Sequence, residues 1–267
     1  MIRRDELRKL KVEVEKIVNE AFEFAKKNEK NKNDYILFLS RSTYDPEARG
    51  IFSPWQLDNS IQERIDRHRV DFLLQYLTER YNFQTENSVD SKFTLTIELM
   101  IYSHLWESKH NLANFKKLAD FCDSKPYDWN VKIPEDSKYK FVKDNIREVF
   151  KKHNLKIYDI FKDCYSSQLR NAFAHSLYHF SLNGNNLVFE NYDGVKYLTE
   201  ELSFDDWTII FLKSALLQNT YHNKFNSEIE ELEDGKEFEV IMEYNEEKIE
   251  GIISYDKSYR RFSGKIK

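Results

Sequence analysis

Residues 155–177 read LKIYDIFKDCYSSQLRNAFAHSL and decide the fold expected for the chain. Apolar residues recur there mostly at spacings of three and four, the mark of a helix packed along one face. Neither Pro nor Gly interrupts the stretch. We therefore expect one helix from about Leu155 to Leu177, with His175 inside its apolar stripe. The apolar positions are Ile157, Phe161, Cys164, Tyr165, Leu169, Ala172, Phe173 and Leu177.

The rest of the chain has the composition of a helical protein. It contains 20 Phe and 16 Tyr against only 6 Gly and 4 Pro, and few breakers favour long amphipathic helices over a strand-rich sandwich. A Ser203-Phe-Asp-Asp pattern marks a helix start. We expect a mainly α fold, a helical bundle. Its other helices are predicted at residues 4–29, 61–81, 93–107, 112–122, 139–152 and 204–231.

Strand signals are short and lie around this helical body. Residues 35–40 could form a short buried strand, whereas 42–59 and 125–137 are typical of irregular loops. Residues 178–190 predict a β-hairpin that turns at Asn183-Gly184 and caps the helix before it. Three alternating stretches, at 238–244, 248–255 and 259–262, predict an antiparallel β-meander packed on the helices or on a partner.

This pattern predicts a division of the chain into three parts. Residues 1–60 form an N-terminal helix and irregular extension, 61–231 the helical domain, and 232–267 a C-terminal β-meander appendage.

Arg170, Asn171 and His175 bring a permanent cation, an amide and an imidazole within one and a half helical turns. The guanidinium offers a planar fork of donors suited to phosphate, and an imidazole exchanges protons near neutral pH. Asn171 and His175 are four residues apart, so they share a helix face. Arg170 and His175 lie roughly 140° apart around the axis, so they meet only if the Arg stem curls round or two chains share the site. The trio predicts binding and cleavage of a phosphodiester.

A lone His on an apolar face is more often a core residue than a catalytic one. The neighbouring Arg170 and Asn171 favour the catalytic interpretation, because a site buried in a seam between two helices needs a His at that position.

Arg170-Asn171 followed by three residues and His175 resembles the signature of the HEPN superfamily of helical domains. Many members are metal-independent endoribonucleases of toxin, antiphage and CRISPR-associated systems, in which two protomers pair their motif helices. The resemblance implies a homodimeric endoribonuclease that needs no cofactor, with Arg170, Asn171 and His175 as its catalytic residues. Other members have lost catalysis, so an inactive HEPN-like dimeric scaffold or a protein- or RNA-binding module is the alternative.

The same resemblance implies a toxin or antiphage defence effector acting on RNA, which could be controlled by an antitoxin or regulator protein. Ser176, Tyr178 and His179 follow the motif directly and are candidates to line its pocket.

Basic residues suggest where RNA would bind. Residues 138–156 hold seven Lys or Arg against two acidic residues, although the net charge of the chain is −5. That net charge argues against a dedicated duplex-binding protein. The tail at 257–267 combines five cations with Tyr259 and Phe262, which suits stacking on single strands or an ordinary edge strand. A solvated helix face is the alternative for the RNA-contact candidates of the helix, which are Lys140, Lys143, Arg147 and Lys151.

Other classes of site have weaker signals. His175 and His179 have the spacing of a metal-binding pair, but no third ligand accompanies them, so no metal is expected. Cys122 and Cys164 lie far apart and predict free core thiols in a reducing compartment. No apolar stretch has the length of a signal peptide or a membrane span, so we expect a soluble, cytoplasmic protein.

Overall fold

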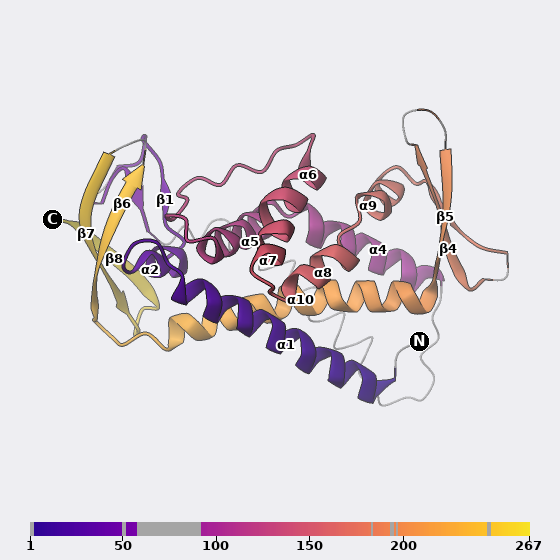
Figure 1. Ribbon diagram of the computed structural model, residues 1–267, viewed down its shortest axis with the longest axis horizontal. Coiled ribbons are helices and arrows are strands. Elements are labelled where there is room, and N and C mark those ends of the chain that lie inside the picture. Colours follow the sequence, from indigo (N-terminus) through magenta and orange to yellow (C-terminus); the bar gives the residue numbers. More distant parts are fainter. Residues whose placement is uncertain are drawn as a thin grey trace.

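The computed structural model describes residues 3–49, 52–57, 92–182, 184–192, 195, 197–244 and 247–267. Two long helices, α1 (Arg4–Lys27) and α10 (Phe204–Glu230), pack along each other and set the long axis of the molecule (Figure 1). The side chain of Ser203 caps α10 by accepting a hydrogen bond from the Asp206 N–H at 3.1 Å. Both helices confirm the predictions made for 4–29 and 204–231.

Further helices pack against these two. The predictions for 93–107, 112–122 and 139–152 are confirmed, except that the last contains a π-helical turn, η1. The helix predicted at 61–81 lies outside the described residues. The elements are α4 (Lys92–Glu107), α5 (Lys109–Cys122), α6 (Lys138–Val142), η1 (Lys143–Arg147), α7 (Glu148–Lys152), α8 (Ile157–Cys164) and α9 (Ser167–Ala174).

The expectation of a mainly α protein is wrong, because the described residues also form three small antiparallel sheets. The predicted hairpin and meander are present, but the hairpin gains a third strand, β5. In β5 the adjacent Glu200 and Glu201 interrupt the alternation of apolar and polar residues from which a strand is predicted. A two-stranded sheet also lies within the predicted loop 42–59. The sheets are β1 (Thr43–Tyr44) with β2 (Trp55–Gln56); β3 (Tyr178–Phe180), β4 (Asn186–Tyr192) and β5 (Tyr197–Ser203); and β6 (Glu237–Tyr244), β7 (Glu247–Asp256) and β8 (Arg261–Ile266).

The strand expected at residues 35–40 is also wrong. This segment is a helix, α2 (Asp34–Leu39), and all six of its residues are buried. A short apolar run has no polar face from which a period can be read, so periodicity cannot separate a buried strand from a buried helical turn.

The two three-stranded sheets lie at opposite ends of the helical body (Figure 1). β4 packs against α9 and β5 against α10, while the C-terminal meander packs against α2 through β6. One core cluster contains side chains from α1, α10 and the meander, including Phe22, Phe211 and Met242. The predicted boundary near residue 60 lies outside the described residues, and the three-part division remains a prediction.

Candidate functional site

The motif residues lie on and just after α9, a helix of eight residues that is separate from α8. The chain leaves the helical conformation at Tyr165, with φ −87° and ψ 101°. Ser166 starts the new helix, because its hydroxyl accepts a hydrogen bond from the Leu169 N–H at 3.2 Å. The expectation of one continuous helix over 155–177 is therefore wrong. Serine favours such N-cap positions, where its hydroxyl replaces a missing backbone partner.

Tyr102 of α4 stabilises this break from the opposite side. Its fully buried hydroxyl donates to the Cys164 carbonyl at 2.7 Å and accepts from the Ser166 N–H at 2.9 Å. Two backbone groups that lose their helical partners are thus satisfied inside the core, where an unpaired polar group would be costly.

The break and the early end of α9 remove His175 from the apolar stripe. The buried positions of α9 are Leu169 and Ala172, and the helix ends before His175, which is its C-cap and is exposed. The expectation of a buried His175 is wrong for this reason.

A Schellman motif ends α9 at this point. The Ser176 N–H donates to the Phe173 carbonyl at 3.1 Å, and the Leu177 N–H donates to the Ala172 carbonyl at 2.7 Å. Ser176 adopts the left-handed conformation, with φ 56°, which glycine normally fills at this position. The turn carries the chain directly from His175 into β3.

Ser176→Gly should therefore stabilise the protein. The left-handed conformation costs an L-residue roughly 1–2 kcal/mol, which glycine avoids. Glycine loses more conformational entropy on folding, which offsets about 0.5–1 kcal/mol of this gain. We therefore expect the free energy of unfolding to rise by about 0.5–1 kcal/mol. Denaturant titration measures this gain, with Ser167→Gly in the first turn of α9 as a control that should destabilise. A loss of stability in Ser176→Gly would show that the hydroxyl has a structural role.

Arg170 is bound within its own protomer. Its Nη1 lies 2.7 Å from Oε1 of Glu107, at the end of α4, and its Nη2 donates to Oδ1 of Asn171 at 3.0 Å. The other carboxylate oxygen of Glu107 bonds the ammonium of Lys138. The Arg170 side chain is only 17% exposed. Asn171 therefore orients the guanidinium, and a phosphate would have to compete with Glu107 for it.

The other predicted pocket residues differ in how far they are exposed to solvent. Ser176 and His179 are exposed, whereas Tyr178 is half-buried and its ring packs 5.9 Å from that of Phe173. Within the described part of the chain, no hydrogen bond or ion pair joins Arg170 and His175. The two groups are thus brought to one end of the molecule without meeting within one protomer.

The predicted basic stripe is only partly available. Lys140 and Lys143 are exposed, but Arg147 and Lys151 both pair with Glu148, at 2.8 and 3.7 Å. The π-helical turn at Lys143–Arg147 also adds a residue to the helix, so positions after it are rotated relative to those before it. The four side chains therefore do not form the single stripe expected from α-helical spacing.

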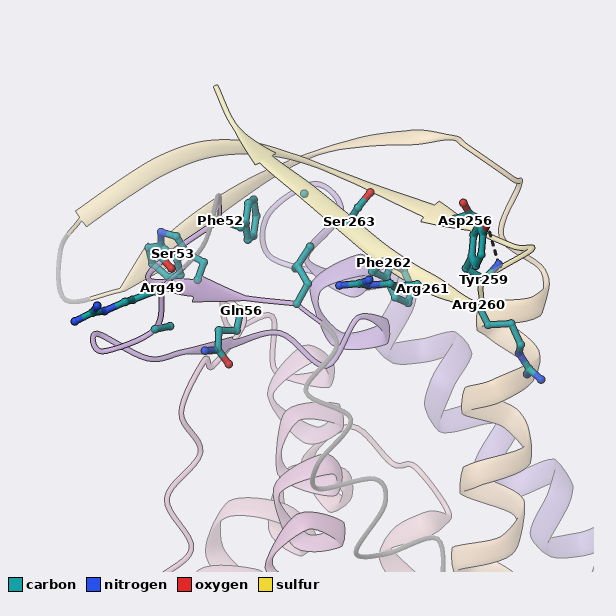
Figure 2. A pocket seen from close by; sticks show the side chains of 14 residues that line it. Arg49, Phe52, Ser53, Gln56, Asp256, Tyr259, Arg260, Arg261, Phe262 and Ser263 are labelled. Carbon is teal, nitrogen blue, oxygen red and sulfur yellow. Dashed lines mark hydrogen bonds between the residues drawn. The ribbon is translucent and has the colours of Figure 1, made fainter.

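The basic tail lies far from the motif, at the other end of the molecule. A cavity of about 1180 Å³ lies between β8 and the residues around β1 and β2. Figure 2 shows Arg49 and Arg260 at its two ends. Tyr259 is 81% exposed, as a stacking residue would be, but β8 is also an edge strand. The structure agrees with both interpretations of the tail, stacking on single strands and an ordinary edge strand. In either case the tail lies far from α9.

The two cysteines are not candidate nucleophiles. Both are free and buried, and burial raises the pKa of each thiol to about 12. A thiol with that pKa carries almost no reactive thiolate at neutral pH.

A second group of titratable residues had no recognisable sequence signal. Arg41, His110 and Lys117 line a cavity between α5 and two connecting segments. They are scattered in the sequence, and only the position of His110 and Lys117 on one helix could have related any of them beforehand.

Among the described residues, no group of three or more His, Cys, Asp or Glu side chains could hold a metal ion. No helix in this part of the chain combines the length and apolar character needed to cross a bilayer. Comparison with known proteins found no matching family model, no matching curated protein and no matching solved structure.

Proposed function

We propose that the protein is a metal-independent endoribonuclease of the HEPN type. The observation that supports this best is the exposed imidazole of His175 at the end of α9, one and a half turns after an Arg170 held by Asn171. An exposed imidazole can reach a substrate, and a guanidinium at the same end of the molecule can bind phosphate bidentately.

In the proposed reaction, His175 removes the proton from a ribose 2′-hydroxyl or donates one to the departing 5′-oxygen. The 2′-oxygen attacks the phosphorus, the bond to the 5′-oxygen breaks, and the products are a 2′,3′-cyclic phosphate and a 5′-hydroxyl. Arg170 stabilises the negative charge that builds on the phosphate in the transition state. Asn171 keeps the guanidinium in place for this role.

The complete site requires two protomers. Each chain supplies one motif histidine, whereas the reaction needs both an acid and a base. A two-fold axis beside α9 would bring two copies of Arg170 and His175 together. The exposure of Asn171, His175 and Ser176 leaves this end of α9 accessible to a partner copy.

Cleavage of RNA in excess EDTA tests the proposed chemistry. We expect full activity of the wild-type protein after chelation, and fragments that carry 2′,3′-cyclic phosphate ends detectable by mass spectrometry. Loss of cleavage with EDTA, restored by a single divalent ion, would contradict acid–base catalysis by His175. It would also direct attention to the pair His175 and His179 as ligands.

The alternative is an inactive HEPN-like dimeric scaffold or a protein- or RNA-binding module. The ion pair between Arg170 and Glu107 favours it, because a structural ion pair uses the same guanidinium. A dimer that binds partners but never cleaves RNA, at any metal or pH condition, would support this second function.

We further propose a cytoplasmic setting, with the enzyme acting as a toxin or antiphage effector under an antitoxin or regulator protein. The two free, buried cysteines agree with a reducing compartment.

A further inference from the structure

One exposed aromatic side chain lies beside the proposed cleavage motif and has no role in it so far. Among the described residues, the large exposed apolar side chains include two aromatic ones, Tyr139 on α6 and Tyr259 in the tail. Tyr259 lies at the end of the molecule opposite α9, whereas Tyr139 adjoins the residues that hold Arg170. Tyr139 is 42% exposed, although it directly follows Lys138, which is buried.

Two ion pairs place Tyr139 next to Arg170. The Lys138 ammonium binds one carboxylate oxygen of Glu107, and the other carboxylate oxygen lies 2.7 Å from Nη1 of Arg170. Glu107 therefore bridges the residue before Tyr139 and the cation that is proposed to bind the scissile phosphate.

Aromatic packing gives a second, independent link to the same place. Tyr139 stacks on Tyr165, with ring centres 5.9 Å apart and ring planes at 10°. Tyr165 in turn packs at 5.1 Å against Trp106, the residue before Glu107. Burial raises the pKa of Tyr165 to about 12, and the positive charge of the nearby Arg170 opposes that shift. The three rings continue the core outward, and Tyr139 is the outermost of them.

The stacking orients Tyr139 and leaves part of its ring open. Tyr165 covers one face of the ring, and the described residues place no other ring or cation over Tyr139. The exposed surface of Tyr139 therefore lies away from Tyr165. The Tyr139 hydroxyl also interacts with the Arg147 side chain, which holds the far edge of the ring. A ring that is already held in one orientation loses little freedom when a second planar group stacks on it.

We propose that Tyr139 stacks on a base of single-stranded RNA next to the phosphate that Arg170 binds. Every nucleobase has a flat π face, and exposed aromatic rings bind such faces in proteins that recognise single strands. Bases in a duplex are already stacked on one another, so the contact requires an unpaired nucleotide. The inference rests on the proposed endoribonuclease function, and it adds a binding residue and a substrate class to the same site.

Fluorescence anisotropy of a short, labelled oligoadenylate with the full-length His175→Ala protein tests the stacking, because this parent protein should leave the RNA intact. Tyr139→Leu, added to the parent, keeps an apolar contact with Tyr165 but removes the planar ring. It should weaken binding about five- to 150-fold, the range for one base stacked on an aromatic side chain. Tyr139→Phe keeps the ring and should bind as the parent does. Phe24→Leu is the matched control: Phe24 is a half-buried aromatic residue of α1 that packs on His153, outside the site, so affinity should not change.

Photocrosslinking provides a readout that does not depend on whether Tyr139→Leu folds. A single-stranded RNA that contains iodouridine is irradiated with the His175→Ala protein, and the crosslinked residue is mapped by mass spectrometry. We expect the crosslink at Tyr139. Absence of saturable RNA binding by the parent protein, or unchanged affinity in Tyr139→Leu with crosslinks only at other residues, would overturn the inference.

Binding does not require catalysis, so this inference and the proposed function fail separately. A wild-type protein that never cleaves RNA, but whose RNA binding is weakened by Tyr139→Leu, would contradict the endoribonuclease and support the stacking residue. Cleavage by the wild type, together with unchanged affinity in Tyr139→Leu and no crosslink at Tyr139, would overturn the stacking residue alone.

Discussion

His175→Ala is expected to lower the rate of RNA cleavage by about 10²–10⁴-fold, the range that positioned proton transfer contributes. The fold should survive. The imidazole is exposed, and the part of His175 that caps α9 is its backbone N–H, bonded to the Asn171 carbonyl at 2.9 Å. Surface substitutions of this kind change the free energy of unfolding by about 0.5 kcal/mol or less. Single-turnover cleavage and thermal melting of the same preparations measure the two quantities.

His104→Ala provides the control for this experiment. His104 is also an exposed histidine, near the end of α4 and outside the motif, so its loss should leave the cleavage rate unchanged. Wild-type cleavage by His175→Ala would remove His175 from the mechanism. A large fall in melting temperature without loss of specific activity would instead assign it a structural role.

Local sequence signals were sufficient to predict the long helices. In α1 the apolar stripe and the alternating charges determine both the helix and its buried face, and seven of its residues are buried. In α10 the N-cap at Ser203 determined the start to the residue. The C-terminal meander was predicted for the same reason, since the register of Phe238 opposite Ile253 pairs alternating apolar positions.

The break before the motif could not be predicted in this way. Its stabilising partner, Tyr102, is 62 residues from Cys164 in the sequence, and periodicity reports nothing about such a distant hydroxyl. Ser166 was the available local signal, because serine favours N-caps, but an uninterrupted apolar pattern outweighed it. The predicted continuous helix places His175 in a buried stripe, whereas the structure places it at an exposed helix end. The break therefore makes His175 accessible to a substrate.

The cavity lined by Arg41, His110 and Lys117 was likewise beyond prediction from the sequence. Lys117 lies in the helix predicted at 112–122, whereas His110 lies before that range and Arg41 lies before the predicted irregular segment 42–59. Their convergence depends on the packing of the loop that carries Tyr127 against Ser42. Charged groups brought together by tertiary structure leave no spacing pattern in the chain.

Arg170→Lys is expected to lower cleavage by about 10²–10³-fold, the loss typical of removing one electrostatic stabiliser of the transition state. Lysine keeps the charge but presents a single ammonium in place of a planar fork. The structure adds a competing explanation, because Arg170 also forms an ion pair with Glu107 at 2.7 Å, and this contact would weaken in the variant. A rate measurement on Arg170→Lys alone cannot separate phosphate binding from positioning by Glu107.

Glu107→Gln separates these two roles of Arg170. The substitution keeps the shape of the side chain but removes the charge that holds Arg170 and Lys138. If Arg170 binds the phosphate, its guanidinium is released from a competitor, so cleavage by Glu107→Gln should equal or exceed that of the wild type. If Arg170 matters only as the partner of Glu107, Glu107→Gln should reproduce the loss seen in Arg170→Lys. Cleavage by both variants is measured at a temperature below their melting transitions, together with their stability. The comparison decides whether the ion pair between Arg170 and Glu107 belongs to a catalytic site or to an inactive scaffold.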